Sequence, residues 1–192
     1  PDYFTIQYIA SRPGILSSRA GELQVYSNGC VIVGGDHQLI ANGDSISYGP
    51  IWDSYCEDVG YPSDQINLVL PWPEDSNKAI VFHQRTTDGF LTNYLLYSVI
   101  RFSGPDTNGL VIIKDSLLLD PGSSSLLTAT RHANGRDWWL ILPENATNRF
   151  FIMLLDPSGV SVVDTQAIGQ PWEEREWASQ AVFTPDGSRF IR

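Results

Sequence analysis

The sequence feature that most constrains the fold of this chain is a set of four strand-like segments that recurs after about 60 residues. Apolar runs rich in β-branched and aromatic residues alternate with clusters of Gly, Pro, Asn and Asp, and helical periodicity is almost absent. Leu68 and Thr128 hold equivalent positions 60 residues apart, and Val81 and Leu140 are 59 residues apart. Four-strand units at this spacing are typical of the blades of a β-propeller.

Two complete units are expected, with turn-forming residues between their strands. The strands of the first are expected at residues 66–70, 79–83, 94–102 and 110–113, and those of the second at 126–130, 138–142, 150–155 and 160–163. A third set begins with strands at 180–183 and 189–191. A β-sandwich would also contain short strands, but it would be less likely to repeat the same four-strand order.

The region before residue 64 is less regular. Strands are expected at 23–27 and 30–33, joined by a type I′ hairpin turn at Asn28-Gly29. Residues 39–40 lead into a second turn at 42–44, and residues 45–63 are expected to form a loop.

These patterns predict an all-β fold, a β-propeller-like series of consecutive four-stranded antiparallel blades of which about three are present. The chain is expected to be a single partial domain, 1–192, with blade-like units near 3–63, 64–120, 121–170 and a truncated 178–192. Closing a ring needs at least about four blades, and an open ring leaves strand edges unpaired. We therefore expect the rest of a longer parent chain, or another copy, to complete the propeller.

One turn carries a resemblance to a known family. The segment Phe183-Thr184-Pro185-Asp186-Gly187-Ser188-Arg189 resembles the hairpin signature of WD40-like propeller repeats, in which Pro presets φ, Asp bonds nearby backbone and Gly accepts a positive φ. Together with the stretch His132-Ala133-Asn134-Gly135, it resembles the N-terminal propeller of large secreted bacterial surface proteins associated with gliding motility and type IX secretion. The resemblance covers the chain from about residue 23 onward and implies an exported, non-enzymatic propeller followed by further modules.

Charge and composition exclude several partners. The 192-residue chain has a formal net charge of −10, which repels phosphate backbones and anionic lipids, so no nucleic acid partner is expected. No apolar run approaches 18 residues, so no direct membrane insertion is expected. The chain begins with Pro1 rather than Met, and we expect that a leader or longer N-terminus has been removed.

No catalytic, metal or cofactor motif is present. The three histidines, His37, His83 and His132, form no metal-binding spacing, and no Ser is placed with a His and an Asp in a recognisable order. Most carboxylates lie in turns, where turn chemistry explains them. We therefore expect a non-enzyme with no cofactor and no metal.

Several residues are singled out for structural or binding roles. Cys30 and Cys56 could be free thiols or, in an exported protein, a disulfide. Four tryptophans in expected loops could stack on a surface glycan or anchor a protein partner, whereas Trp138 and Trp139 are expected to pack between blades. The four loop tryptophans are Trp52, Trp72, Trp172 and Trp177. Residues expected to shape hairpins are His132, Asn134, Gly135, Asp137, Pro185, Asp186 and Gly187, with His132 hydrogen-bonded across its hairpin to Asp137 or a backbone carbonyl.

The preferred functional hypothesis is a non-catalytic module of a secreted or cell-surface protein that mediates protein–protein or surface contacts. Two alternatives remain open. One is a carbohydrate-binding propeller that uses loop Trp and Tyr. The other is the accessory propeller of a peptidase or other hydrolase whose catalytic domain lies outside this chain.

Overall fold

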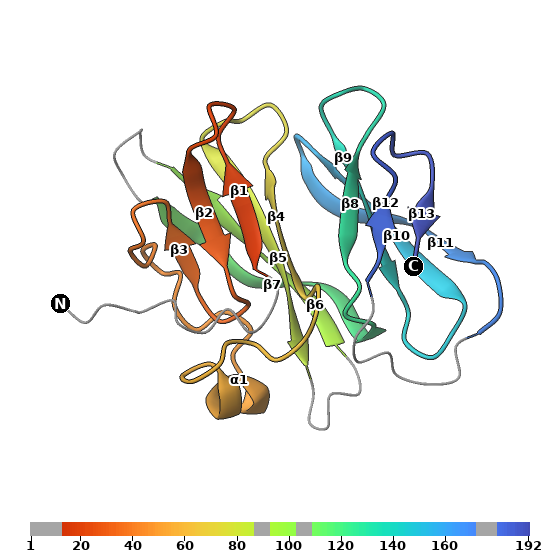
Figure 1. Ribbon diagram of the computed structural model, residues 1–192, viewed down its shortest axis with the longest axis horizontal. Helices are drawn as coiled ribbons and strands as arrows, with labels where there is room; N and C mark the ends of the chain where they lie inside the picture. The colour runs from red at the N-terminus through yellow and green to blue at the C-terminus, as the bar shows by residue number, and fades with distance from the viewer. Residues whose placement is uncertain (1–12, 87–92, 103–108, 172–179) are drawn as a thin grey trace.

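The structure is a computed structural model that describes residues 13–86, 93–102, 109–171 and 180–192. Its regular structure is almost entirely β-strand, arranged in four antiparallel sheets (Figure 1). The all-β prediction is confirmed.

The four sheets follow one another along the chain, and within each sheet the strands are hydrogen-bonded in sequence order. The first sheet contains β1 (Gly14–Ser17), β2 (Leu23–Ser27) and β3 (Ile32–Gly34). The second contains β4 (Asn67–Pro71), β5 (Lys78–Thr86), β6 (Asn93–Arg101) and β7 (Leu110–Ser123). The third contains β8 (Thr128–Arg131), β9 (Trp138–Pro143), β10 (Arg149–Asp156) and β11 (Gly159–Ala167). The fourth contains β12 (Val182–Phe183) and β13 (Phe190–Ile191).

Several strands differ from the expectation: β5 and β11 run three and four residues further than expected, to Thr86 and Ala167, and two differences are larger. β1 was not expected, because this four-residue strand begins at the glycine of a Pro-Gly pair, which is a turn signal. β7 runs to Ser123 rather than ending at residue 113, and so it crosses the expected unit boundary at 120. The pairing of β6 with β7 contains several register shifts. Asp115, with a φ of 52°, therefore interrupts the alternation of side chains between the two faces of β7 without ending the strand.

Sheet packing explains why β5 contains a continuous run of apolar residues, 79–82. Successive side chains of a strand point to opposite faces, so Val81 faces the first sheet and Phe82 faces the third. Val81 packs in a cluster with Val25 of β2, and Phe82 packs in another with Leu140 of β9. The second sheet is therefore buried on both faces.

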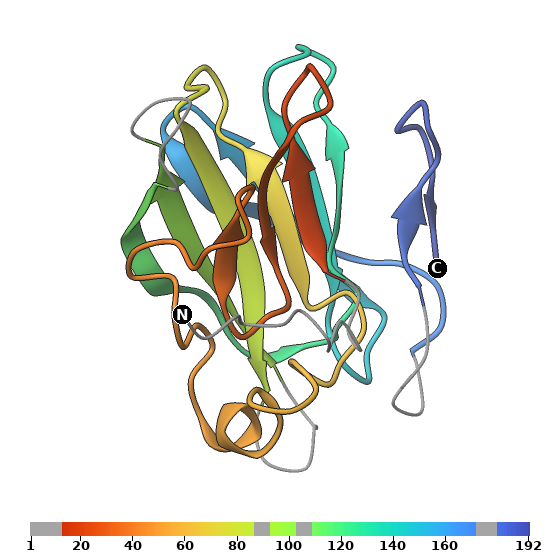
Figure 2. The same ribbon diagram turned by 60° about the vertical axis from the view of Figure 1, so that its left-hand side comes forward.

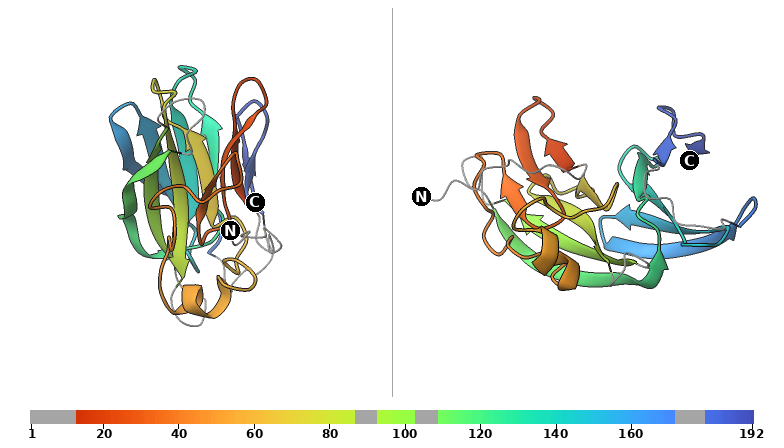
Figure 3. Two further views of the ribbon diagram at one scale, coloured as in Figure 1. Left: turned by 90° about the vertical axis from the view of Figure 1, so that its left-hand side faces the viewer. Right: turned by 60° about the horizontal axis from the view of Figure 1, so that its bottom comes forward.

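The first strands of neighbouring sheets lie together. β1 lies beside β4, and β12 lies beside β8. The Gly14 N–H donates to the Asn67 side-chain oxygen, which joins the first sheet to the second. Gln65 joins the others: its carbonyl accepts from Leu127 N–H (3.3 Å), and its side chain bonds the N–H and carbonyl of Ala181 (2.7 and 2.9 Å). Figure 2 and the right-hand view of Figure 3 show the sheets from two further sides, and in the latter they follow one another along a curve.

Two local expectations in the N-terminal region are wrong. Ser27 pairs with Ile32, so the β2–β3 loop has four residues, and Gly29 (φ 85°) but not Asn28 has the positive φ that a type I′ turn requires at both centres. Residues 45–63 contain a short helix, α1 (Pro50–Tyr55), which begins with a proline at its first turn. Across the described residues, no helix has the length and apolar character needed to cross a membrane.

Candidate ligand-binding cleft

A cleft of about 840 Å³ lies at the end of the sheets where three hairpin tips meet. Its walls are the β1–β2 hairpin, the β4–β5 turn and the β8–β9 turn, all at the top of Figure 1. A cleft of this size is typical of small-molecule and oligomer-segment sites. The sequence did not predict it, because its walls come from three different sheets.

The β4–β5 turn carries the first charged pair of the cleft. Asp75 accepts a hydrogen bond from Asn77 N–H (3.0 Å) and forms an ion pair with Lys78 (2.9 Å). The Lys78 ammonium is the main reason that the pKa of Asp75 lies below its usual value. The same ammonium lies over the Trp72 indole, 5.4 Å from the ring centroid.

Trp72 has a structural role in addition to lining the cleft. Its indole N–H donates to the carbonyl of Pro157 (3.3 Å), in the β10–β11 turn of the third sheet. Its ring packs against the hydrophobic cluster between the second and third sheets. Trp72 is therefore a bridge between two sheets rather than a freely exposed platform.

Replacement of Trp72 by phenylalanine is expected to lower the free energy of unfolding by about 1 kcal/mol, the usual net value of one hydrogen bond. Urea denaturation measures this change. Trp139→Phe is a matched control, because the Trp139 indole N–H has no hydrogen bond to another residue that the structure describes. Equal losses in both variants would show that the Pro157 bond contributes nothing.

The β8–β9 turn is organised by Asn134. Its side-chain oxygen accepts from Arg136 N–H (2.9 Å) and Asp137 N–H (3.0 Å), and its side-chain nitrogen donates to the Asp137 carboxylate (2.6 Å). Gly135 has a φ of 73°, a conformation that favours glycine. His132 bonds across the hairpin through its main-chain N–H, which donates to the Asp137 carbonyl (2.8 Å). Its imidazole accepts from Asn134 N–H through Nδ1 (3.0 Å).

Arg136 connects this turn to the turn of the neighbouring sheet. Its guanidinium forms ion pairs with Asp137 (2.7 Å) and with Glu74 (3.0 Å). The hydrogen bond from Arg136 is the main cause of the lowered pKa of Asp137, and the two carboxylates raise the pKa of Arg136. The charge of Arg136 is therefore balanced within the wall of the cleft.

Arg131 is held differently. Its guanidinium lies over the Trp138 indole, 4.1 Å from the centroid, and donates to the carbonyls of Gly135 (3.2 Å) and Arg136 (3.5 Å). Within the described part of the chain, Arg131 has no carboxylate partner. Its positive charge therefore remains available at the wall of the cleft.

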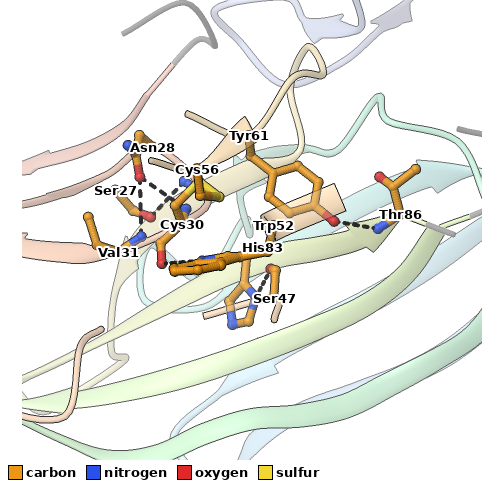
Figure 4. Close-up of a disulfide and its surroundings, with 11 residues drawn as sticks. Ser27, Asn28, Cys30, Val31, Ser47, Trp52, Cys56, Tyr61, His83 and Thr86 are labelled. Atoms are coloured by element: carbon orange, nitrogen blue, oxygen red, sulfur yellow. Dashed lines mark hydrogen bonds between the residues drawn. A yellow bond between two sulfur atoms is a disulfide. The ribbon is translucent and has the colours of Figure 1, made fainter. Parts of the chain in front are cut away.

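The two cysteines and Trp52 lie away from the cleft. Cys30 and Cys56 form a disulfide with a Cα–Cα distance of 5.7 Å (Figure 4). Trp52 lies on α1 rather than in a loop, is half-buried beside the disulfide and donates its indole N–H to the Cys30 carbonyl (3.3 Å). Trp172 and Trp177 lie outside the described residues.

The β12–β13 turn has the geometry expected of its sequence. Asp186 accepts from Ser188 N–H (3.1 Å), and Gly187 has a φ of 69° beside Pro185. The hydroxyl of Thr184 is the main cause that lowers the pKa of Asp186 to about 2. Asp186 and Gly187 therefore have the turn-forming roles expected from the sequence.

The sequence did not predict a group of Ser and Asp side chains that contact the buried His83. The Ser47 hydroxyl lies 2.8 Å from His83 Nδ1, the Ser98 hydroxyl lies 2.9 Å from Nε2, and an Asp115 oxygen lies 3.5 Å from Nε2. Ser47, His83 and Ser98 are fully buried, so no substrate reaches the hydroxyl groups. Burial lowers the pKa of His83 to about 3, which makes it a weak base. The contact between Ser47 and His83 attaches the 45–63 segment to the second sheet. The four residues are too far apart in sequence to form a recognisable motif.

No group of three His, Cys, Asp or Glu side chains that could hold a metal occurs among the residues that the structure describes. Comparisons with protein-family profiles, with curated proteins and with solved structures found no match to this chain.

Proposed function

We propose that this chain is part of a β-propeller in a secreted or cell-surface protein, and that it acts as a non-catalytic recognition module through the cleft between its hairpin tips. The observation that carries the proposal is the convergence of three hairpins from three neighbouring sheets on one cleft. Binding sites commonly lie on loops that a rigid scaffold positions, and here the scaffold is a set of sheets packed face to face.

The adjacency of the first strands supports the propeller assignment. β1 beside β4 and β12 beside β8 are the contacts expected when the first strand of each blade lies nearest the ring axis. Gln65 joins the starts of three consecutive sheets in the same region.

The open face of the third sheet supports the idea that further structure completes the ring. Phe190 of the fourth sheet packs on Phe150 with ring centroids 5.7 Å apart. On the same face, Ile141 and Ile152 remain only partly buried. A further sheet from the parent chain or from another copy would cover these side chains.

The disulfide supports an exported protein. Disulfides persist in oxidising compartments and are rare in the cytosol. The bridge between Cys30 and Cys56 is buried in a cluster that includes Tyr61 and Ile66, as a structural bridge would be.

The Ser47–His83–Ser98–Asp115 contacts do not form a hydrolytic site, and they do not bear on the accessory-propeller alternative, whose catalytic domain lies outside this chain. A nucleophile must meet its substrate, and Ser47 is fully buried. His83 also presents Nδ1 to the serine and Nε2 to the aspartate side, the reverse of the usual triad arrangement.

The proposal is tested by filling the cleft. Gln24 lines the cleft, and Gln24→Trp is expected to reduce binding to cell-surface material of the source organism by about tenfold or more, because the larger ring excludes ligand. Gln38→Trp is the matched control, since Gln38 is exposed and lies outside the cleft. A folded wild-type protein that binds no surface material, or binding unaffected by Gln24→Trp, would overturn the proposal.

A further inference from the structure

We infer that the cleft binds an acidic saccharide, a uronate-type oligosaccharide whose carboxylates are held by Arg19 and Arg131. The inference rests on the proposed function and specifies its ligand. It begins with charge: the chain has a net charge of −10, yet four of its twelve Lys and Arg residues line this one cleft. They are Arg19, Lys78, Arg131 and Arg136.

Two of these four cations are neutralised by carboxylates. Lys78 pairs with Asp75, and Arg136 pairs with Glu74 and Asp137. These pairs rigidify the walls and leave little charge for a ligand.

The other two cations are available. Among the residues described, Arg131 donates only to backbone carbonyls, and the exposed Arg19, at the tip of the β1–β2 hairpin, has no carboxylate partner. They stand on different walls of the same cleft. A guanidinium binds a carboxylate through two parallel hydrogen bonds, so the pair can hold carboxylates spaced along one ligand.

The tryptophans argue for an acidic sugar over a neutral one. Neutral sugars commonly stack on an open indole face. Here Lys78 covers one face of Trp72, Arg131 covers one face of Trp138, and both rings also pack against the core cluster. The ligand therefore meets cationic groups where a neutral-sugar site would present bare aromatic rings.

The neutral polar lining favours a saccharide over an acidic peptide. Ser17, Gln24 and Ser76 line the cleft, and hydroxyl and amide side chains can both donate to and accept from sugar hydroxyls. An acidic peptide offers carboxylates but few hydroxyls to use this lining.

The test is isothermal titration calorimetry of the whole chain with three probes of similar length: a galacturonate hexamer, a neutral maltohexaose and a hexaglutamate peptide. We expect the galacturonate hexamer to bind more tightly than either other probe, with affinity that falls as salt rises. Arg19→Gln and Arg131→Gln should each weaken its binding by about tenfold, the loss expected for one charge-assisted bidentate contact.

Arg149→Gln is the matched control and should leave affinity unchanged, because Arg149 is exposed at the opposite end of the third sheet and pairs with Glu144. Arg19 is exposed at a hairpin tip, so Arg19→Gln is informative even if Arg131→Gln fails to fold. Equal binding of maltohexaose, tighter binding of hexaglutamate, no binding of the galacturonate hexamer, or indifference to Arg19→Gln would each overturn the inference. If Gln24→Trp still abolishes binding to surface material in those cases, the ligand class is wrong while the proposed recognition site stands.

Discussion

Replacement of His83 by phenylalanine is expected to lower the free energy of unfolding by about 3 kcal/mol or more, because it leaves two buried hydroxyls without their partner. The imidazole is fully buried and contacts Ser47 on one side and Ser98 on the other. The Ser98 hydroxyl also accepts from Asp115 N–H (3.1 Å), so the loss affects the β6–β7 pairing. Because phenylalanine is similar in size to histidine, the substitution leaves little or no cavity, and the expected loss comes mainly from the hydrogen bonds.

The same residue makes stability depend on pH. Burial lowers the pKa of His83 to about 3 in the folded protein, whereas an unfolded chain has its ordinary value of about 6.5. Between these values the unfolded state binds a proton that the folded state does not. The contribution of His83 to the free energy of unfolding is therefore fully present above about pH 6.5. It falls by about 1.4 kcal/mol per pH unit as the pH falls toward 3.

Urea denaturation of wild type and His83→Phe between pH 7 and pH 4.5 measures both effects. Burial raises the pKa of Asp115, which acts in the opposite direction as pH falls, so the difference between the two proteins is the informative quantity. We expect the wild type to lose its advantage as pH decreases. A variant of wild-type stability at pH 7, or parallel pH curves, would contradict the structural role of His83.

Removal of the Cys30–Cys56 disulfide is expected to cost about 3 kcal/mol, the loop-entropy value for a separation of 26 residues. The bridge closes the loop that contains α1 and holds the Trp52 contact to the Cys30 carbonyl. It also lies in the same cluster as Tyr61, whose hydroxyl accepts from Thr86 N–H (2.7 Å) (Figure 4). Loss of the bridge should therefore loosen the segment that carries Ser47.

The double variant Cys30→Ala/Cys56→Ala is compared with wild type by urea denaturation, with and without a reducing agent. Wild type should lose stability when reduced, and the double variant should not respond to the reducing agent. A reduced wild type as stable as the oxidised protein would contradict the prediction. The variant also tests coupling, because its effect and that of His83→Phe should be less than additive if both act on the 45–63 segment.

The sequence alone was sufficient to predict the class of fold and most strands of the second and third sheets. Their apolar runs are separated by turn residues that act locally, as at Asn134 and Asp186, where a side chain bonds backbone two or three residues away. Local signals failed where the conformation was set by distant contacts. β1 is short and is joined to β4 of the next sheet by the hydrogen bond from Gly14 N–H to the Asn67 side chain, and α1 is fixed by a disulfide.

Pairing of the cysteines, burial of His83 and formation of the cleft were decided only by the tertiary structure. The cysteine spacing fits a bridge or two thiols, and nothing near His83 in sequence marks Ser47 or Asp115 as its neighbours. The cleft joins Arg19, Trp72 and Arg131 from three sheets. Turn and strand patterns depend on residues a few positions apart, whereas these features depend on how whole sheets pack against one another, which is set by apolar surfaces distributed along the entire chain.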